Sequence, residues 1–202
     1  MYLIHERRNA FFNEHAETWE DSESFPENAA QVEGIIHSLE SIPDGNILDV
    51  GTGTGIALKS LQEITGSDDL VVGIDLAENM LDQAGDKGAS LVRCDAHRLP
   101  FASATFGTVF AFAVVPHLDT PKQFFIEASR ILCPDGLLVV LHLMSREECN
   151  DFHRKAGTAV EHDVLPAPGE LDRFARLVGF RREQFEEREG LFLWTARRHS
   201  TE

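Results

Sequence analysis

ILDVGTGTG, at residues 47–55, is the stretch that decides the fold. Its first part, Ile47 to Val50, has the length and composition of a buried strand. Residues 55–64 continue with the spacing of a helix, so a strand, a tight turn and a helix follow one another. Glycines at such a turn permit positive φ angles, and the helix start offers unpaired N–H groups. The stretch therefore predicts a ligand site at the end of a strand.

The spacing of these glycines separates the turn from two common phosphate sites. A dinucleotide fingerprint has the form G-x-G-x-x-G, but here the third glycine, Gly55, comes one position early and Ile56 follows it. A phosphate-binding P-loop needs a lysine directly after its last glycine, and Lys59 lies too far along the chain. The turn therefore favours neither a pyrophosphate nor a triphosphate ligand.

Strands and helices alternate on both sides of this turn, which predicts parallel strands joined by helical crossovers. We expect an α/β fold, namely a doubly wound, Rossmann-like, seven-stranded sheet with helices on both faces. The sheet should be mostly parallel and end in a C-terminal antiparallel hairpin across Glu189-Gly190. The expected strands are 47–50, 70–75, 90–93, 106–114, 137–143, 180–187 and 191–196, and the expected helices are 6–19, 26–39, 55–64, 77–84, 121–132, 146–155 and 170–178.

Composition and charge limit the classes of partner. The chain has 202 residues and a formal net charge of −16, so it should repel phosphate backbones. No apolar run approaches the ~20 residues that span a bilayer. Three scattered cysteines and an early charged N-terminus favour a cytoplasmic protein. We expect a small-molecule partner, no nucleic acid and no membrane, although the acidity also serves solubility.

Two acidic residues follow the next two expected strands. Asp75 ends the second strand, where a carboxylate can accept from two ribose hydroxyls or can cap the helix that begins near Ala77. Asp95, followed by Ala96, comes after the third strand. This pair can accept from an exocyclic amine and donate to a ring nitrogen, or can belong to a solvated loop. Both alternatives stay open for each residue.

Taken together, these segments resemble the class I S-adenosylmethionine-dependent methyltransferases. Residues 47–55 resemble the first motif of that family, and residues 73–81 resemble its second-strand motif. Residues 94–96 and 99–101 are similar to the adenine loop of its ubiquinone/menaquinone-type branch, methyltransferase type 11. Residues 106–118 and 130–138 fall in register, so the resemblance covers roughly residues 46–143.

The resemblance implies S-adenosylmethionine as cofactor and S-adenosylhomocysteine as its product. It places the glycine turn and Asp49 at the methionine part, with Asp49 beneath the amino group. It places Asp75 at the ribose hydroxyls, and it implies that apolar side chains of the second-strand motif pack near the adenine. The implied cofactor-binding residues are Asp49, Gly51, Thr52, Gly53, Gly55, Asp75, Leu76, Met80, Cys94, Asp95, Ala96, Ala111 and Phe112.

Two residues depart from the family pattern. Gly107 stands where the family usually has Asp, and we expect this change to loosen a structural contact. Asp135 stands where the family usually has Gly, and we expect it to alter a turn. Neither residue belongs to the implied cofactor groups, so both departures should leave cofactor binding intact.

The implied domain division gives one methyltransferase domain over residues 1–202. Residues 1–43 would form an N-terminal helical cap, and 44–143 the cofactor-binding core. Residues 144–168 would be a substrate-side insertion, and 169–202 a helix followed by the C-terminal hairpin.

Methyl transfer from a sulfonium is an in-line displacement, so alignment can supply much of the catalysis. A base is needed only where the acceptor must lose a proton, and histidine is suited to that role near neutral pH. His117 follows the fourth strand and is the candidate catalytic residue, with a structural or solvated role as the alternative. The segment at 111–114 reads AFAV and lacks the D/N/S-P-P-Y signature of nucleic-acid amino methyltransferases.

The candidate acceptor-binding residues come from two parts of the chain. His142, His153 and His162 lie in the segment at residues 142–163, and Trp19 lies in the N-terminal helices. Cys149 and His153 are four residues apart and share a helix face, which would suit zinc. No C-x-x-C or H-E-x-x-H pattern accompanies them, so we predict an acceptor pocket and no metal. The N-terminal helices could form a lid over the cofactor or simply pack on the sheet.

The function expected from the resemblance is methyl transfer from S-adenosylmethionine to a small-molecule acceptor, by a monomer or homodimer. Two alternatives stay open. One is a non-catalytic module that binds S-adenosylmethionine or S-adenosylhomocysteine without turnover. The other is an NAD-type oxidoreductase, which Ile56 disfavours because a glycine is wanted there.

Overall fold

The computed structural model describes residues 2–85, 87–156 and 159–199, and its centre is a single seven-stranded sheet. The strand order is β3-β2-β1-β4-β5-β7-β6. The first five strands run parallel, whereas β7 pairs antiparallel with both β5 and β6. The fold predicted from the sequence is thus confirmed. The strands are β1 (Asn46–Val50), β2 (Val71–Asp75), β3 (Ser90–Arg93), β4 (Phe106–Phe112), β5 (Leu132–His142), β6 (Phe180–Arg188) and β7 (Leu191–Arg198).

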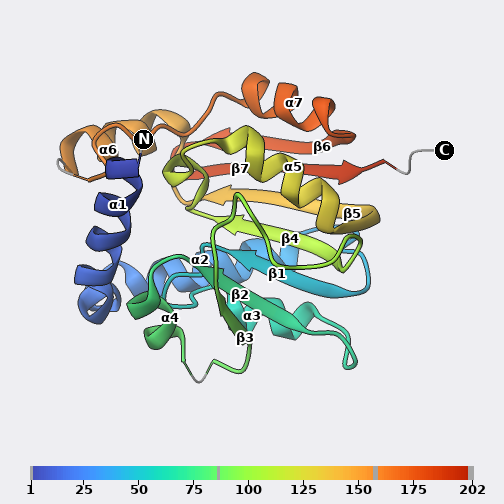
Figure 1. Cartoon of the computed structure of the whole chain (residues 1–202), viewed down its shortest axis with the longest axis horizontal. Coiled ribbons are helices and arrows are strands. Elements are labelled where there is room, and N and C mark those ends of the chain that lie inside the picture. The colour runs from blue at the N-terminus through green and yellow to red at the C-terminus, as the bar shows by residue number, and fades with distance from the viewer. Residues whose placement is uncertain (1, 86, 157–158, 200–202) are drawn as a thin grey trace.

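Helices cover both faces of the sheet (Figure 1). α5 and α7 lie on one face, and α2 and α3 lie on the other. The helices are α1 (Tyr2–His15), α2 (Phe25–Ser38), α3 (Leu58–Ile64), α4 (Glu78–Ala84), α5 (Pro121–Ile131), α6 (Arg146–Ala156) and α7 (Pro168–Leu177), with short 3₁₀ helices η1 (Ala16–Asp21) and η2 (Val115–His117).

The core has two halves because the central parallel strands are buried on both faces. Alternate residues of β5 point to opposite sides, so Val140 packs in one cluster with Phe124 of α5. Val139 packs in the other cluster with Ile36 of α2. This continuous burial explains why the strands read as unbroken apolar runs in the sequence.

The outer edge of the sheet is different in character. β6 is exposed along almost its whole length and carries charged residues of both signs. Charges on an edge strand oppose pairing with another sheet. Among the described residues, no helix combines the length and the apolar character needed to span a membrane.

Several element boundaries differ from the sequence prediction, and the differences at β5 and α3 have a clear cause. β5 begins at Leu132 rather than at 137, and its pairing with β4 shifts register across a turn that contains Asp135. Asp135 has φ 61°, a conformation in which glycine is usual and aspartate is tolerated. Glycine adopts this backbone conformation without strain, which explains why a glycine suits this position. α3 begins at Leu58, because residues 51–57 are spent on a wide turn.

Gly107 corrects an expectation. A Cβ built there would lie 2.4 Å from the backbone oxygen of Asp44, so the position is tightly filled rather than loosened. An aspartate side chain has no room here unless the turn at residues 43–44 moves.

This tight packing gives a stability prediction. Replacing Gly107 by alanine should destabilise the fold by about 1–3 kcal/mol, because the clashing atom is backbone and cannot rotate away. Gly34→Ala, in α2 with nothing within 4 Å of its Cβ, should instead stabilise by about 0.5–1 kcal/mol. Denaturant unfolding of both variants checks the pair, and equal effects would contradict the packing.

The order of the strands places a ligand site. β1 and β4 are neighbours at the centre, and the chain leaves them toward opposite sides of the sheet. A crevice outside the carboxyl ends of the strands forms at such a switch point. In Figure 1, α1 runs along the edge of the sheet at which β4 and β5 end.

Candidate functional site

A cavity of about 630 Å³ lies at this edge of the sheet. The volume falls in the range of about 300–1,000 Å³ that is usual for small-molecule sites. Its walls come from the glycine turn after β1, the loops after β2 to β5, α6 and the N-terminal segment α1–η1. It therefore joins residues from most of the chain.

The glycine turn forms one wall of the cavity. Gly51 has φ 68°, and a Cβ there would come within 2.4 Å of Val114, so only glycine fits. Gly53 has φ 55°, and a Cβ there would meet only open space up to the backbone oxygen of Gly51 at 4.0 Å. The backbone at Gly53 is thus open to a ligand.

Asp75, the last residue of β2, holds the glycine turn that follows β1. Its carboxylate accepts hydrogen bonds from the backbone N–H of Gly53 at 3.0 Å and of Ala77 at 2.8 Å. Burial raises the pKa of Asp75, while these backbone hydrogen bonds lower it. The Asp75 carboxylate therefore lines the cavity and binds the N–H of Ala77, but Asp75 is not the helix N-cap, because that position is Ala77 itself.

Asp49 lies directly beneath the same turn. It is fully buried, and the hydroxyl of Thr52 donates to its Oδ2 at 2.6 Å. Burial, followed by the nearby charge of Asp75, raises the pKa of Asp49 to about 7, against the lowering effect of Thr52. This carboxyl therefore changes its charge near neutral pH.

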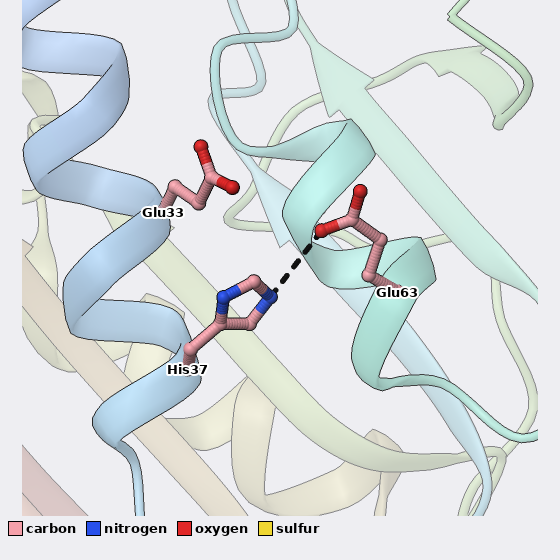
Figure 2. A group of neighbouring side chains, drawn as sticks. All are labelled: Glu33, His37 and Glu63. Atoms are coloured by element: carbon pink, nitrogen blue, oxygen red, sulfur yellow. Dashed lines mark ion pairs between the residues drawn. The ribbon is translucent and has the colours of Figure 1, made fainter.

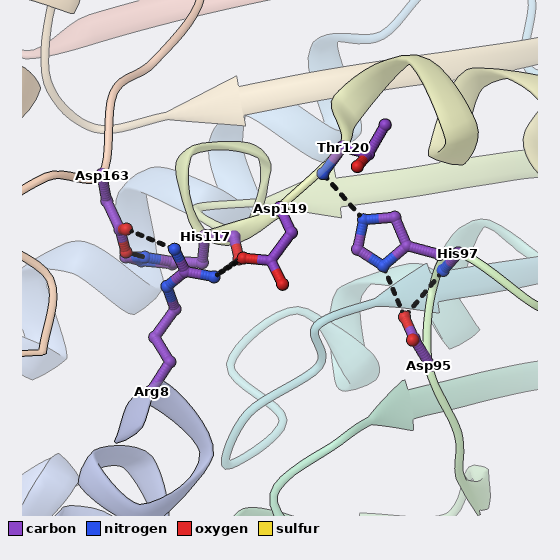
Figure 3. A network of polar contacts seen from close by, with 7 residues as sticks. All are labelled: Arg8, Asp95, His97, His117, Asp119, Thr120 and Asp163. Atoms are coloured by element: carbon purple, nitrogen blue, oxygen red, sulfur yellow. Dashed lines mark hydrogen bonds and ion pairs between the residues drawn. The ribbon is translucent and has the colours of Figure 1, made fainter. Parts of the chain in front are cut away.

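The loop after β3 is tied to the loop after β4 through His97 (Figure 3). Oδ1 of Asp95 accepts from the backbone N–H and from Nδ1 of His97, the latter at 2.6 Å. Nε2 of His97 accepts from the backbone N–H of Thr120 at 3.2 Å. Burial and the acidic neighbours raise the pKa of Cys94 to about 11, so this cavity residue stays a neutral thiol.

His117, which also lines the cavity, belongs to a network of partly buried charged side chains (Figure 3). Its Nδ1 lies 2.6 Å from Oδ2 of Asp163. The guanidinium of Arg8 donates to Oδ1 of Asp163, to Oδ1 of Asp119 and to the backbone oxygen of His117, each at 2.7 Å. An imidazole held by a buried carboxylate is the arrangement of a general base.

Two further histidines lie near His117. His153 donates from Nδ1 to the backbone oxygen of Asp163 at 3.1 Å, and Sγ of Cys149 lies 4.0 Å from the same nitrogen. His142 is buried, and its Nε2 has no hydrogen-bond partner within the described part of the chain. Burial and the neighbouring histidines lower the pKa of His142 to about 3, so it stays neutral.

Most of the predicted site residues line this one cavity. Those that line it are Gly51, Thr52, Gly53, Asp75, Leu76, Met80, Cys94, Asp95, Ala96, Phe112, His117, Trp19, His142 and His153. The others lie elsewhere. Asp49 lies below the turn, Ala111 is buried in the core, and Gly55 borders a separate small depression beside Lys59. His162 does not line the cavity, since 83% of its side chain is exposed.

The comparison with protein families gives the deciding observation. A family model described as a methyltransferase domain matches residues 48–140, from β1 to β5. Residues 48–140 of the chain thus carry a methyltransferase domain. The cofactor of the family is S-adenosylmethionine, and the matched residues include the glycine turn, Asp75 and the loop after β3.

Curated relatives of the chain carry different acceptor names. A ubiquinone/menaquinone biosynthesis C-methyltransferase of Desulfotalea psychrophila is 34% identical over 48% of this chain and 41% of its own. An O-methyltransferase of Pyrenophora dematioidea is 27% identical over 68% and 55%. A probable tRNA methyltransferase 9B of Homo sapiens is 27% identical over 60% and 26%. The chain thus spans about half or less of these relatives.

A solved structure, described as the DhpI complex with S-adenosylhomocysteine, has the same fold over the whole chain. The two superpose with a TM-score of 0.77 at 18% identity, covering 100% of each chain. At this identity the likeness concerns the fold alone.

The residues at the cavity fit the cofactor of the family. The absence of a side chain at Gly53 leaves space for a ligand. The Asp75 carboxylate has lone pairs that can accept hydrogen bonds from hydroxyl groups. Leu76 and Met80 give the apolar surface that a flat ring needs. A polar end for a ribose thus adjoins an apolar wall for an adenine.

A second group of ionisable side chains lies on the surface between α2 and α3 (Figure 2). Glu33, His37 and Glu63 bring ligand-type atoms within 4.8 Å of one another, and Nε2 of His37 lies 3.3 Å from Glu63. All three are exposed. Because exposed acidic groups commonly pair in this way, we interpret the group as a surface ion pair.

Sequence reasoning missed the partners of His117. Arg8 and Asp163 come from segments that are distant from His117 in the sequence, Asp119 follows it by two residues, and no local motif marks any of them. His97 was likewise missed as the link between two loops. Only Asp163 had a signal in the sequence, because it directly follows His162, a predicted acceptor-binding residue.

Proposed function

We propose that this methyltransferase transfers the methyl group of S-adenosylmethionine to a hydroxyl of a small, mostly apolar acceptor, with His117 as the proton acceptor. The observation that carries the proposal is the 2.6 Å contact between Nδ1 of His117 and the buried Asp163 at the cavity wall. The cofactor, when bound, supplies a methyl group on a positively charged sulfur. The protein must then align the acceptor oxygen and accept its proton.

The contact with Asp163 defines the direction of proton transfer. A carboxylate only accepts hydrogen bonds, so Nδ1 of the neutral His117 carries the proton and Nε2 is the basic nitrogen. Asp163 also stabilises the imidazolium that forms after transfer, because its side chain is only 1% exposed and its charge is poorly screened. A hydroxyl acceptor needs such a base, whereas an acceptor without an acidic proton does not.

The walls near His117 favour a neutral, apolar acceptor. Phe12, Phe112, Met144 and Phe152 line the cavity, and Phe12 packs against His117. His142 is neutral, so it offers hydrogen bonding without charge. The relative described as an O-methyltransferase supports an oxygen acceptor. We also propose that residues 1–43 serve as the cap of this pocket and residues 144–168 as its acceptor-side insertion.

A nucleic-acid acceptor is the competing proposal, because one relative is described as a probable tRNA methyltransferase. The net charge of −16 opposes it, since RNA binding depends on basic residues that neutralise phosphates. We therefore propose a small molecule and no nucleic acid.

The experiment that tests the proposal is an acceptor screen that measures S-adenosylhomocysteine release. The acceptors are phenols and aliphatic alcohols, matched amines, and total tRNA. We expect release with hydroxyl acceptors and none with tRNA. Turnover on tRNA, or turnover on amines alone, would overturn the acceptor class, and cofactor binding without any turnover would favour the non-catalytic module.

A further inference from the structure

Arg8 is the element of the His117 network that comes from the N-terminal helix. Its side chain is 11% exposed, and it lies between Asp119 and Asp163 (Figure 3). Nη1 donates to Asp119 and to the backbone oxygen of His117, while Nη2 donates to Asp163. One guanidinium thus binds both Asp163, which contacts the His117 ring, and the backbone oxygen of His117 itself.

The geometry suits arginine rather than a simple positive charge. A guanidinium presents several donors in one rigid plane, so it can bind two carboxylates and a carbonyl at once. The two oxygens of Asp163 are divided between Arg8 and His117. Rotation of Asp163 away from His117 would break its hydrogen bond with Arg8, so Arg8 fixes the direction of the carboxylate.

We propose that Arg8 is a positioning residue that assembles the His117–Asp163 pair, so that the base is complete only when α1 is seated over the cavity. The inference rests on the proposed function of His117 as a base. It adds that the N-terminal helix, outside the residues matched by the family model, supplies part of the catalytic arrangement.

The remaining contacts of the N-terminal segment support this dependence. Asn13 of α1 accepts two hydrogen bonds from Asn79 of α4. Lys87 joins Glu20 of η1 to the backbone oxygen of Thr54 in the glycine turn. These contacts are exposed or partly buried, and they all end on elements that border the cavity. α1 is therefore seated by the rim of the site more than by a core of its own.

Packing in the segment agrees with this description. In α1 and η1, Ala16 alone is buried among the side chains that are described, which are those from residue 6 onward. Phe12 packs edge-on against His117 with ring centres 5.1 Å apart. The segment thus touches His117 through an aromatic ring and through Arg8.

The charges around His117 predict how Arg8 affects its protonation. The carboxylates that face it are Asp163, Asp119 on its own loop and, farther away, Asp75 of β2. The neutral His142 and the buried His153 also lie near it. Arg8 is the permanent cation in this described set. Its removal leaves carboxylates whose fields favour the imidazolium, so the acid limb of the pH–rate profile should move to higher pH.

The test compares three variants by side-chain ¹⁵N NMR of histidine-labelled protein. Arg8→Gln removes the charge, Arg8→Lys keeps the charge without the planar fork, and Arg7→Gln is the control on an exposed neighbouring arginine. The signal of His117 is assigned from its absence in His117→Asn. We expect the Nδ1–H form in the unsubstituted protein and in Arg7→Gln, and a mixture of Nδ1–H and Nε2–H forms in Arg8→Gln. Arg8→Lys should lie between them.

Kinetics with the best acceptor of the screen give the second measurement. Arg8→Gln should lower kcat by about 10²-fold through misplacement of the base, with the acid limb shifted upward. Affinity for S-adenosylhomocysteine should stay unchanged. An Arg8→Gln protein that keeps the pure Nδ1–H form would overturn the inference. Failure of the proposed function is separate, because it would appear as absent turnover in the unsubstituted protein while the NMR comparison still stands.

Discussion

His117→Asn is expected to lower kcat by about 10²–10⁴-fold for a hydroxyl acceptor, the usual contribution of a general base. Asparagine keeps a hydrogen-bonding group near Asp163 but has no nitrogen that can take a proton near neutral pH. The affinity for S-adenosylhomocysteine should stay the same, because the contacts of the His117 ring are with Asp163, Phe12 and His153 rather than with the glycine turn. The loss should therefore be confined to turnover.

Steady-state rates and calorimetric titration with S-adenosylhomocysteine measure these two effects separately. His162→Asn is the matched control, since that histidine is exposed and outside the cavity. Asp163→Asn should reproduce most of the loss in kcat, because it removes the charge that stabilises the imidazolium. If His117→Asn retained near-normal turnover, the acceptor would need no base and His117 would have a structural role.

Asp49→Asn is expected to weaken cofactor binding and, at the same time, to stabilise the cofactor-free protein above neutral pH. Burial raises the pKa of Asp49 from 3.8 to about 7. A group whose pKa is higher in the folded state favours folding at low pH, and that contribution is lost as pH rises through the folded value. The unsubstituted protein should therefore lose stability between about pH 4 and pH 7 through this one carboxyl.

The difference of about three pKa units corresponds to a loss on the order of 4 kcal/mol, as an upper limit. Asparagine stays neutral, so the free energy of unfolding of the Asp49→Asn protein should not fall with pH in this way. At pH 8 that variant should melt at a higher temperature than the unsubstituted protein. The oxygen of asparagine can still accept from Thr52, which limits the cost of the substitution. Thermal unfolding of the cofactor-free proteins at pH 5 and pH 8 measures the difference.

Cofactor titration completes this test. An ionised Asp49 beneath the turn attracts the positively charged amino group of the cofactor, so affinity should rise from pH 6 to pH 8 in the unsubstituted protein. The rise should be absent in Asp49→Asn. Asp82→Asn, which changes an exposed carboxylate of α4, should alter neither stability nor affinity. Identical pH profiles for Asp49→Asn and the unsubstituted protein would contradict the role of Asp49.

Local sequence patterns predicted the cofactor half of the molecule well. The apolar run Ile47–Val50, the glycines after it and Asp75 lie within one strand–turn–helix unit and its neighbour. Each signal is local, because a buried parallel strand needs an apolar run and a tight turn needs glycine. The predicted strands and helices accordingly lie within a few residues of the observed ones, apart from the early start of β5.

The acceptor half was predictable only in part, because its contacts join distant segments. Arg8 and Asp163 are 155 residues apart, and no periodicity records that they meet. The loop at 159–167 shows the consequence. Asp163 is buried against His117, whereas the neighbouring His162, predicted as an acceptor residue, faces solvent. In an irregular loop the facing of consecutive side chains depends on tertiary contacts, so the sequence alone did not separate the two.

We propose above all that the cavity at the glycine turn binds S-adenosylmethionine. Calorimetric titration of the unsubstituted protein with S-adenosylmethionine and S-adenosylhomocysteine, with NAD as the control, tests it most directly. We expect both sulfur-containing ligands to bind at one site per chain and NAD to give no heat of binding. Absence of binding by both, or binding of NAD in their place, would contradict the assignment of the turn and the function built on it.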